Sequence, residues 1–560
     1  MHTKVNIVNV LLFALLLACS CKSKRAADEP VIVTTPEQMD EMVTTNLRAV
    51  LQYAGDNQGN ITDKQKLSYT ELVGLFYQKN EYKALWSSRE MWHPIADSML
   101  HFIRDAREYG LYPKALHFTD LDTLMSKSST DSLTRIDAMA WTKADLLLSD
   151  AFIRALRELK EGRLVADSLS IIYKKNYQDS FFIRSLLDLK NGASLASIMR
   201  DAEPENGDYW LLRNALKVFA QKMDTAAYIK LSYPYKDSLA FITKVYARLR
   251  QSGYGDSTIQ TPDSLAFDKA LRSFQVDKKM TVDGIAGPGV ARKLNNTDRE
   301  KFRQIAITLD RYKQLAPLPS TYIWVNVPSF WLKVWANDEW IIESKIIVGK
   351  SSTPTPLFNS AISDMVTYPQ WTMPMSIIRK DILPQLKKDP GYLERKGFSL
   401  VSYEGETINP FTVDWSKYNK GIPWKVVQGS GDDNALGVFK FNFNNPYSVY
   451  LHDTNQRYLF KNANRALSHG CVRVEKWQDL AFYIASLDSM LVSDNRQPAY
   501  NADSIRLWIA NKDRKRIMVK SRLPLFIKYF TCEGKNDEVI FYDDIYKNDE
   551  YLADKYFAYF

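Results

Sequence analysis

The chain has 560 residues, of which 45% are hydrophobic and 25% are charged, and this composition is typical of a globular protein of about three to four domains. It excludes a disordered tail protein, a collagen-like fibre and a multi-span membrane protein. The net charge of +9, from 74 Lys and Arg against 65 Asp and Glu, suits an acidic surface or polymer but does not indicate nucleic-acid binding.

The first segment of the chain is typical of an export signal. An apolar run over residues 5–18 is too short to span a bilayer and fits the hydrophobic part of a signal peptide. The run ends at Cys19, in a context that resembles a bacterial lipobox. We therefore predict a lipoprotein signal peptide over residues 1–18, lipidation at Cys19 with Cys21 as the fallback site, and a polar tether over residues 19–45. A plain secretory signal is the alternative, and either signal places the mature protein outside the cytoplasm.

Apolar residues at helical spacing dominate the next part of the chain. Leu148, Phe152 and Leu159 share one face of a helix that Gly162 is placed to end. Similar runs occur over residues 67–77, 211–219 and 239–249. No chemistry-bearing motif accompanies these runs. We predict a helical scaffold domain over residues 46–235.

A compact unit over residues 236–297 follows. Apolar residues spaced around Leu271 predict one helix, Asp283-Gly284 predicts a turn, and Gly287-Pro288 predicts the start of a second short helix. This string resembles the small three-helix peptidoglycan-binding domain, with a departure at Gly289. Because any three-helix module shares the apolar spacing, a purely structural role is the alternative to glycan contact.

The apolar period then changes from 3.6 to 2, which favours strands. Residues 322–327 and 438–450 are rich in strand formers, and Asn337-Asp338 is flanked by two strand-like runs that predict a hairpin. After a scaffold helix and linker over residues 298–320, we therefore predict a mostly β domain over residues 321–500.

An insert over residues 376–431 interrupts this domain. It begins with helical spacing and then becomes rich in Gly, Pro and Asn. A long insert placed before the chemical motif is a candidate lid. Residues 501–560 are predicted to form an extension that packs on the scaffold or the β domain. The fold class is multidomain α+β: a helical scaffold, a three-helix module and a mostly β domain with an inserted lid.

The residues that carry chemistry cluster around one cysteine. His452 ends a strand-like run, and the string His469-Gly470-Cys471 precedes a helix-like one. A thiol attacks as its thiolate, which a nearby histidine, an arginine such as Arg473 or oriented backbone amides favour. Zinc binding by two His and one Cys is the weaker alternative, because His469 and Cys471 are too close in sequence to converge easily. A structural role for these residues also stays open at this point.

His452 and the string from Ser468 to Arg473 match the signature of the L,D-transpeptidase catalytic domain (YkuD type). The likeness extends to the large periplasmic members with a scaffold domain, a peptidoglycan-binding domain and a lid. It is carried by residues 346–350, 355–356, 371–374, 378–384, 389–393, 434–437, 450–454 and 543–546.

The resemblance implies a role for each matching residue. Cys471 is the nucleophile and His452 the proton donor and acceptor. His469, Gly470 and Arg473 shape the oxyanion pocket and hold the donor peptide, and Ser468 supports them. Tyr450 and Trp371 line the substrate channel. Asp453 is not assigned a catalytic role. No metal site and no cofactor is expected, because side chains supply both the proton transfer and the covalent chemistry.

The implied reaction is acyl transfer on peptidoglycan stems. Cys471 attacks a tetrapeptide donor, D-Ala leaves, and the amine of a diamino acid in a second stem captures the thioester to give a 3→3 crosslink. An L,D-carboxypeptidase, with water as acceptor, and a non-catalytic wall-binding lipoprotein are the alternatives. Carbapenem inhibition is a family expectation, and the expected location is the periplasm of the cell envelope, with a lipid anchor in a bacterial membrane. Activity is expected to fall on acidification through the apparent pKa values of the Cys–His pair.

Overall fold

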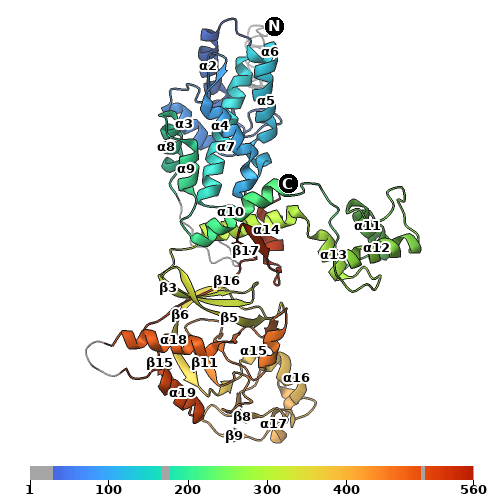
Figure 1. Cartoon of the computed structure of the whole chain (residues 1–560), viewed down its shortest axis with the longest axis vertical. Coiled ribbons are helices and arrows are strands. Elements are labelled where there is room, and N and C mark those ends of the chain that lie inside the picture. Colours follow the sequence, from blue (N-terminus) through green and yellow to red (C-terminus); the bar gives the residue numbers. More distant parts are fainter. Residues whose placement is uncertain (1–28, 166–176, 493–497, 559–560) are drawn as a thin grey trace, which may run out of the picture.

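The computed structural model describes residues 29–165, 177–492 and 498–558. A helical region, a mostly β region and a small helical module that stands to one side make up the chain (Figure 1). The predicted signal peptide and the lipidation sites Cys19 and Cys21 lie outside the described residues. Within the described part, no helix is both long and apolar enough to cross a membrane.

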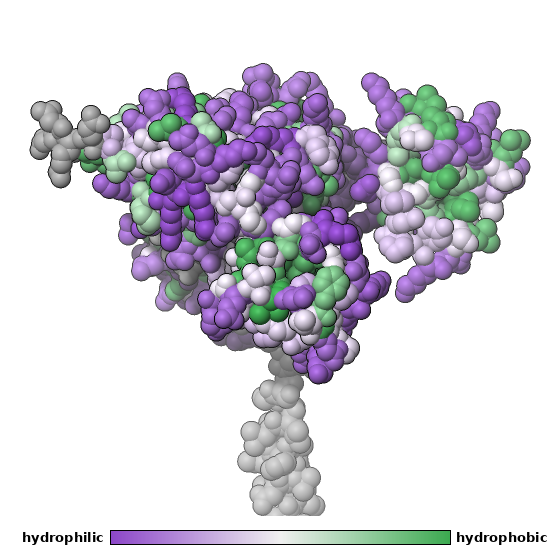
Figure 2. Space-filling view, turned by 90° about the horizontal axis from the view of Figure 1, so that it is seen from below, coloured by the Kyte–Doolittle hydropathy of each residue, from purple (hydrophilic) through white to green (hydrophobic). Residues whose placement is uncertain are grey.

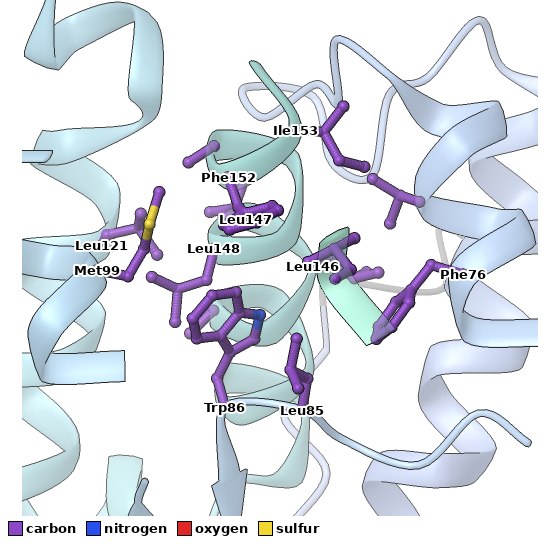
Figure 3. Close-up of a cluster of buried hydrophobic side chains, with 14 of the residues drawn as sticks. Phe76, Leu85, Trp86, Met99, Leu121, Leu146, Leu147, Leu148, Phe152 and Ile153 are labelled. Carbon is purple, nitrogen blue, oxygen red and sulfur yellow. The ribbon is translucent and has the colours of Figure 1, made fainter. Parts of the chain in front are cut away.

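The helical region is built around α7, Ala138–Lys160, which is buried over most of its length. Asp137 caps its start by accepting a hydrogen bond from the Met139 amide, and Gly162 follows its end at a φ of 73°. Side chains on several faces of α7 meet those of the surrounding helices (Figure 3). The other elements of the helical region are α2 (Pro36–Asp56), α3 (Thr70–Lys79), β1 (Ser87–Ser88), β2 (Met91–Trp92), α4 (Pro94–Arg104), η1 (Ala106–Tyr109), η2 (Pro113–Leu116), α5 (Phe118–Thr130), α6 (Ser132–Arg135), α8 (Asp179–Lys190), α9 (Leu195–Ala202) and α10 (Gly207–Lys222).

The predicted tether does not extend to residue 45. Helix α2 begins at Pro36, with Thr35 accepting a hydrogen bond from the Gln38 amide as its cap. Met39 and Val43 of this helix are buried in the helical core. The prediction missed a cap residue followed by proline at the first helical position, which is a common helix start.

The small module comprises α11 (Ser238–Gln251), α12 (Ser264–Asp277) and α13 (Pro288–Asn295), with Pro288 at the first turn as predicted. It has a hydrophobic core of its own, which includes Leu231 ahead of the first helix. Apolar side chains lie on its surface (Figure 2). Leu265 and Ile285 of this module are exposed. The role of the module stays a prediction.

The β region contains one long path of paired strands. Its order is β11-β12-β14-β5-β4-β3-β16-β6-β15, and β6 also pairs with β11, which closes the path into a ring. The strands are β3 (Thr321–Asn326), β4 (Trp331–Ala336), β5 (Glu339–Gly349), β6 (Phe358–Thr367), β11 (Phe439–Phe443), β12 (Leu451–His452), β13 (Ala466–Ser468), β14 (Val472–Val474), β15 (Arg516–Met518) and β16 (Pro524–Lys528). Two helices, α18 (Trp477–Met490) and α19 (Ala502–Ala510), and η6 (Arg457–Lys461) accompany them.

One expectation about this region needs correction. The β domain does not end near residue 500, because β16 lies between β3 and β6 in the ring and pairs in parallel with β3. The run of strand formers over residues 438–450 contains strand β11 and the loop that follows it. Pairing of β11 ends at Phe443, and a loop leads to β12. The hairpin at Asn337-Asp338 is confirmed, with both residues at positive φ.

Residues 371–428 leave the ring between β6 and β11 and form an inserted subdomain. Its sheet has the order β7-β10-β8-β9, and its own apolar core includes Trp415 and Leu386. The elements are β7 (Trp371–Thr372), α15 (Met375–Ile377), the π-helix η3 (Ile378–Ile382), α16 (Leu383–Leu386), α17 (Tyr392–Arg395), β8 (Phe398–Val401), β9 (Thr407–Ile408), η4 (Pro410–Thr412), η5 (Trp415–Lys417) and β10 (Lys425–Gln428).

The last part of the chain joins the two large regions. The hairpin of β17 (Cys532–Lys535) and β18 (Glu538–Phe541), followed by α20 (Asn548–Tyr556), packs on α10 and on α14 (Asp298–Lys313) (Figure 1). Cys532 is fully buried in this contact.

Candidate active site

Cys471 lies in a tight loop between β13 and β14. Gly470 has a φ of 117°, a conformation that residues with a side chain rarely adopt. The Ser468 hydroxyl closes the loop: it donates to the Cys471 carbonyl at 2.6 Å and accepts from the Gly470 amide at 3.1 Å. Because the Gly470 amide is already engaged, Ser468 acts here as a brace of the loop.

A second loop holds this one in place. Thr355 donates its hydroxyl to the Gly470 carbonyl and accepts from the Gly349 amide, both at 2.9 Å. Tyr546, from the end of the chain, donates to the Gly349 carbonyl at 2.7 Å and accepts from the Thr355 amide at 3.1 Å. A side chain at position 349 would collide with the backbone of Thr353. The cysteine loop therefore depends on a close backbone approach and on a residue distant in sequence.

Tyr450 is the neighbour that most favours the thiolate of Cys471. Burial raises the pKa of Cys471, whereas hydrogen bonds from the Tyr450 backbone and hydroxyl lower it, followed by the charges of Lys440 and Arg473. Burial and the neighbouring Cys471 raise the pKa of Tyr450 far above its usual value. Tyr450 therefore stays protonated and donates to the sulfur. Cys471 is partly accessible to solvent.

His452 is buried on the strand next to Cys471. Strands β12 and β14 run in parallel, with His452 opposite Arg473 and the Val472 amide donating to the Tyr450 carbonyl at 3.1 Å. Burial, with the charges of Arg473 and Lys440, lowers the pKa of His452 to about 3, although the backbone at Asp453 and Leu436 opposes this shift. The imidazole is therefore neutral at neutral pH.

Three polar atoms at this site are buried without a hydrogen bond of normal length among the described residues. They are Nδ1 of His452, Nε of Arg473 and Nε1 of Trp371. The Trp371 indole still lies close enough to the Tyr450 hydroxyl to oppose its raised pKa. Buried polar groups in folded proteins are nearly all paired, so this cluster is typical of a site that is completed by a ligand.

The inserted subdomain reaches the site at two points. Trp371 begins its first strand, and Asp381 of η3 lies 2.9 Å from Nε2 of His469 through Oδ2. The His469 and Asp381 side chains are 41% and 40% exposed. His469 thus faces the subdomain, whereas the other predicted site residues gather around Cys471 or brace its loop.

Asp453 does not face His452 with its carboxylate. This fully buried group accepts from the Val438 amide at 3.0 Å and from the Arg457 guanidinium at 3.0 and 2.5 Å. A side chain at Gly437 would collide with it. Asp453 therefore fixes the turn that enters β11 and is no third member of a catalytic triad.

Metal binding finds no support in the described residues. Within them, no group of three or more His, Cys, Asp or Glu side chains is arranged to hold a metal ion. The arrangement places a thiol next to hydrogen-bond donors, two cations and a neutral imidazole. This is the chemistry of nucleophilic catalysis.

Two family models match the chain. Residues 320–492 match the L,D-transpeptidase catalytic domain (YkuD), and residues 71–216 match the scaffold domain. The chain therefore carries an L,D-transpeptidase catalytic domain together with a scaffold domain. A putative L,D-transpeptidase of Haemophilus influenzae is 35% identical over 230 residues, which are 41% of this chain and 45% of that protein. The match thus spans less than half of that relative.

The likeness to solved structures is weaker. The L,D-transpeptidase from Mycobacterium smegmatis is 12% identical, with 37% of this chain and 58% of that one covered at a TM-score of 0.18. The catalytic domain of the E. faecium L,D-transpeptidase, acylated by ertapenem, is 11% identical, with coverage of 38% and 100% and a TM-score of 0.17. Scores this low carry no argument, so the assignment rests on the family models and the curated relative.

Four residues at the site received no role from the sequence: Thr355, Asp381, Lys440 and Tyr546. Three of them lie in strings that resemble the family, which was the available signal. Lys440 lies between Phe439 and Phe441 on β11, and its place beside His452 depends on strand register.

Proposed function

We propose that the chain is an L,D-transpeptidase that forms 3→3 crosslinks between peptidoglycan stems, with Cys471 as its nucleophile. The observation that supports this most directly is the geometry at the sulfur. Cys471 is partly exposed, Tyr450 and the cations Lys440 and Arg473 favour its thiolate, and the adjacent strand carries a neutral imidazole whose Nδ1 makes no hydrogen bond among the described residues.

The charges at the site favour attack by sulfur and quick return of the proton. Lys440 and Arg473 stabilise the thiolate of Cys471 but disfavour an imidazolium at His452. As the sulfur attacks, the thiol proton moves to His452. The imidazolium formed beside two cations is a strong acid, and this is what protonation of a leaving amine requires.

The two half-reactions use the same proton carrier, His452. The sulfur bonds to the carbonyl carbon at the L-centre of the third stem residue, and the carbonyl electron pair moves to oxygen. The Cys471 amide makes no hydrogen bond within the described part of the chain and is the backbone donor for this oxyanion. Collapse breaks the bond to D-Ala, which takes the proton from His452. A stem amine then attacks the thioester carbonyl and gives its proton to His452. Collapse of this second intermediate breaks the C–S bond, and the departing sulfur takes the proton back from His452, which restores the thiol.

The inserted subdomain acts in this proposal as a lid over the acyl-enzyme. Its support is the contact of Asp381 with His469 and that of Trp371 with Tyr450. A closed lid limits access of water to the thioester, which favours the amine as acceptor over hydrolysis.

The test uses the full chain, purified in detergent, with Cys471→Ala and Cys532→Ala as a matched pair. Each protein is incubated with disaccharide-tetrapeptide, and products are read by mass spectrometry. We expect a dimer equal in mass to two monomers minus one alanine with wild type and Cys532→Ala, and none with Cys471→Ala. Alanine release without a dimer would make the chain a carboxypeptidase. No reaction with wild type would favour the wall-binding alternative.

Two further expectations belong to this proposal. A carbapenem acylates Cys471, which is tested by a mass increase of the intact chain that Cys471→Ala lacks. Lipidation at Cys19 anchors the chain in the cell envelope, which is tested by fatty-acid labelling of Cys19→Ala, Cys21→Ala and the double variant in cells.

A further inference from the structure

Lys440 lies beside the candidate nucleophile without a carboxylate partner. It is on β11 between two fully buried phenylalanines, and its register partner across the strand pair is His452. Its Nζ lies 3.9 Å from the centroid of the Tyr450 ring, which is a cation–π contact. No ion pair or side-chain hydrogen bond of Lys440 occurs among the residues that the structure describes.

The charged groups that face Lys440 leave Cys471 as its counter-charge. Burial lowers the pKa of Lys440, and Arg516 adds to this effect, whereas Cys471 and then Asp364 raise the pKa. The Asp364 carboxylate is already bound by the Arg516 guanidinium at 3.1 Å and the Asn442 amide at 2.8 Å. The thiolate of Cys471 is therefore the anion that remains to interact with the ammonium group of Lys440.

A second buried lysine shows what burial does alone. Lys528 on β16 of the same ring is 9% exposed, and burial lowers its pKa to about 8 with no charged group involved. Its Nζ lies 5.9 Å from the centroid of the Phe526 ring, and Cys471 is not among the groups that affect its pKa. Lys440 differs from Lys528 because the candidate nucleophile Cys471 raises its pKa, whereas burial alone acts on Lys528.

We propose that Lys440 is a positioning residue that stabilises the Cys471 thiolate and fixes the Tyr450 ring, whose hydroxyl faces the sulfur. The proposal rests on the proposed function, because it assigns Lys440 to the same reacting thiol. Opposite charges in a partly buried site attract each other more strongly than in water. The contact with the ring also orders Tyr450. The Lys440 ammonium therefore acts on the sulfur of Cys471 both directly and through the hydroxyl of Tyr450.

The test measures thiolate formation without any transpeptidation. The full-length chain in detergent is alkylated with iodoacetamide from pH 5 to 10, and the rate for the peptide that contains Cys471 is followed by mass spectrometry. Wild type is compared with Lys440→Met, Lys440→Gln, Lys440→Arg and the control Lys528→Met. Lys440→Gln carries the test if Lys440→Met folds poorly by thermal melting.

We expect Lys440→Met and Lys440→Gln to shift the midpoint of the alkylation profile upward by about one pH unit, which is about a tenfold slower rate at pH 7. Lys440→Arg keeps the charge and is expected to keep most of the rate, and Lys528→Met is expected to follow wild type. A profile of Lys440→Gln that coincides with wild type would overturn the proposal, as would an equal shift in Lys528→Met.

The outcomes separate this inference from the proposed function. If Cys471 of wild type resists alkylation at every pH, the nucleophile of the proposed function is wrong. If Cys471 is alkylated with the expected dependence on Lys440 but no dimer or alanine forms from the tetrapeptide, the role of Lys440 stands and the assigned reaction falls.

Discussion

One polar cluster in the helical region and the candidate site in the β ring bury their polar groups in opposite ways. In the helical region, the Asp145 carboxylate accepts from the amides of Leu85 and Trp86 at 3.0 and 3.1 Å and from the Tyr77 hydroxyl at 2.6 Å. Ser149 completes this network with the Tyr77 hydroxyl at 2.8 Å and the Trp86 indole at 2.9 Å. Every side chain of this cluster has a partner.

Around Cys471 the same kinds of groups stay unpaired. His452, Arg473 and Trp371 each bury a nitrogen that makes no hydrogen bond of normal length in the described part of the chain. An unpaired buried polar group costs about 1–3 kcal/mol. The first cluster therefore stabilises the fold, whereas the second gives up stability to keep its groups free for a substrate.

The largest effect should come from the unpaired base. We expect His452→Ala to slow alanine release from the tetrapeptide by about 10²–10⁴-fold, because the proton transfers lose their carrier. Stability of the β ring should not fall comparably, since Nδ1 of the imidazole makes no hydrogen bond among the described residues. The exposed residue His101 on α4 supplies the control His101→Ala. An unchanged rate in His452→Ala would assign the base elsewhere.

Breaking the paired network around Asp145 should lower stability and leave the reaction rate unchanged. We expect Asp145→Ala to lower the free energy of unfolding of the helical region by about 3 kcal/mol or more, because three buried donors lose their acceptor. Urea titration followed by hydrogen exchange of α7 peptides measures this, with the exposed Asp188→Ala as control. Alanine release per folded molecule should stay unchanged. A fall in that rate without faster exchange would mean that Asp145 acts on the catalytic site.

The sequence predicted the local elements of the fold better than their assembly. The hairpin at Asn337-Asp338 and the start of α13 at Pro288 follow from turn and cap chemistry, which a short window of sequence contains. The place of β16 does not, because Leu525 pairs with Ile323 across two hundred residues of chain. Nothing local in residues 524–528 indicates that they complete the ring.

The same division applies to the site. Cys471, His452 and Arg473 stand out because their residue types and spacing match a known signature. Lys440 and Asp381 do not, since one depends on the register between β11 and β12 and the other on how the inserted subdomain folds back. The state of the His452 imidazole also needs the structure, because burial and two cations set it together.

The two clusters should respond to acid with opposite signs. The pKa of His452 is about 3 in the folded chain, against about 6.5 unfolded. Its contribution to stability is present above pH 6.5 and is lost as the pH falls toward 3, which amounts to about 2 kcal/mol at pH 5. Burial raises the pKa of Asp145 to about 6. Its contribution is present below about pH 4 and is lost as the pH rises through 6.

Urea titrations between pH 4 and 7.5, read by hydrogen exchange in each region, test this contrast. We expect His452→Gln to flatten the acid loss of the β ring and Asp145→Asn to flatten the opposite trend of the helical region. A β ring whose pH dependence is the same in wild type and His452→Gln would show that the folded imidazole titrates normally.

The smallest effect should come from the contact between the inserted subdomain and the cysteine loop. Because both side chains are two-fifths exposed, their attraction is screened and adds little to stability. Its proposed use is to hold the lid, so we expect Asp381→Asn to raise the ratio of hydrolysed to crosslinked product by about two- to fivefold with little change in alanine release.

Asp414→Asn alters an exposed acid of the same subdomain, which accepts from Ser416 instead, and should leave the ratio unchanged. His469→Ala and the double variant should give the same ratio as Asp381→Asn, because each of the three variants removes the same contact between Asp381 and His469. A double variant with the product of the two single effects would mean that Asp381 and His469 act separately, and the lid would then be held by other contacts.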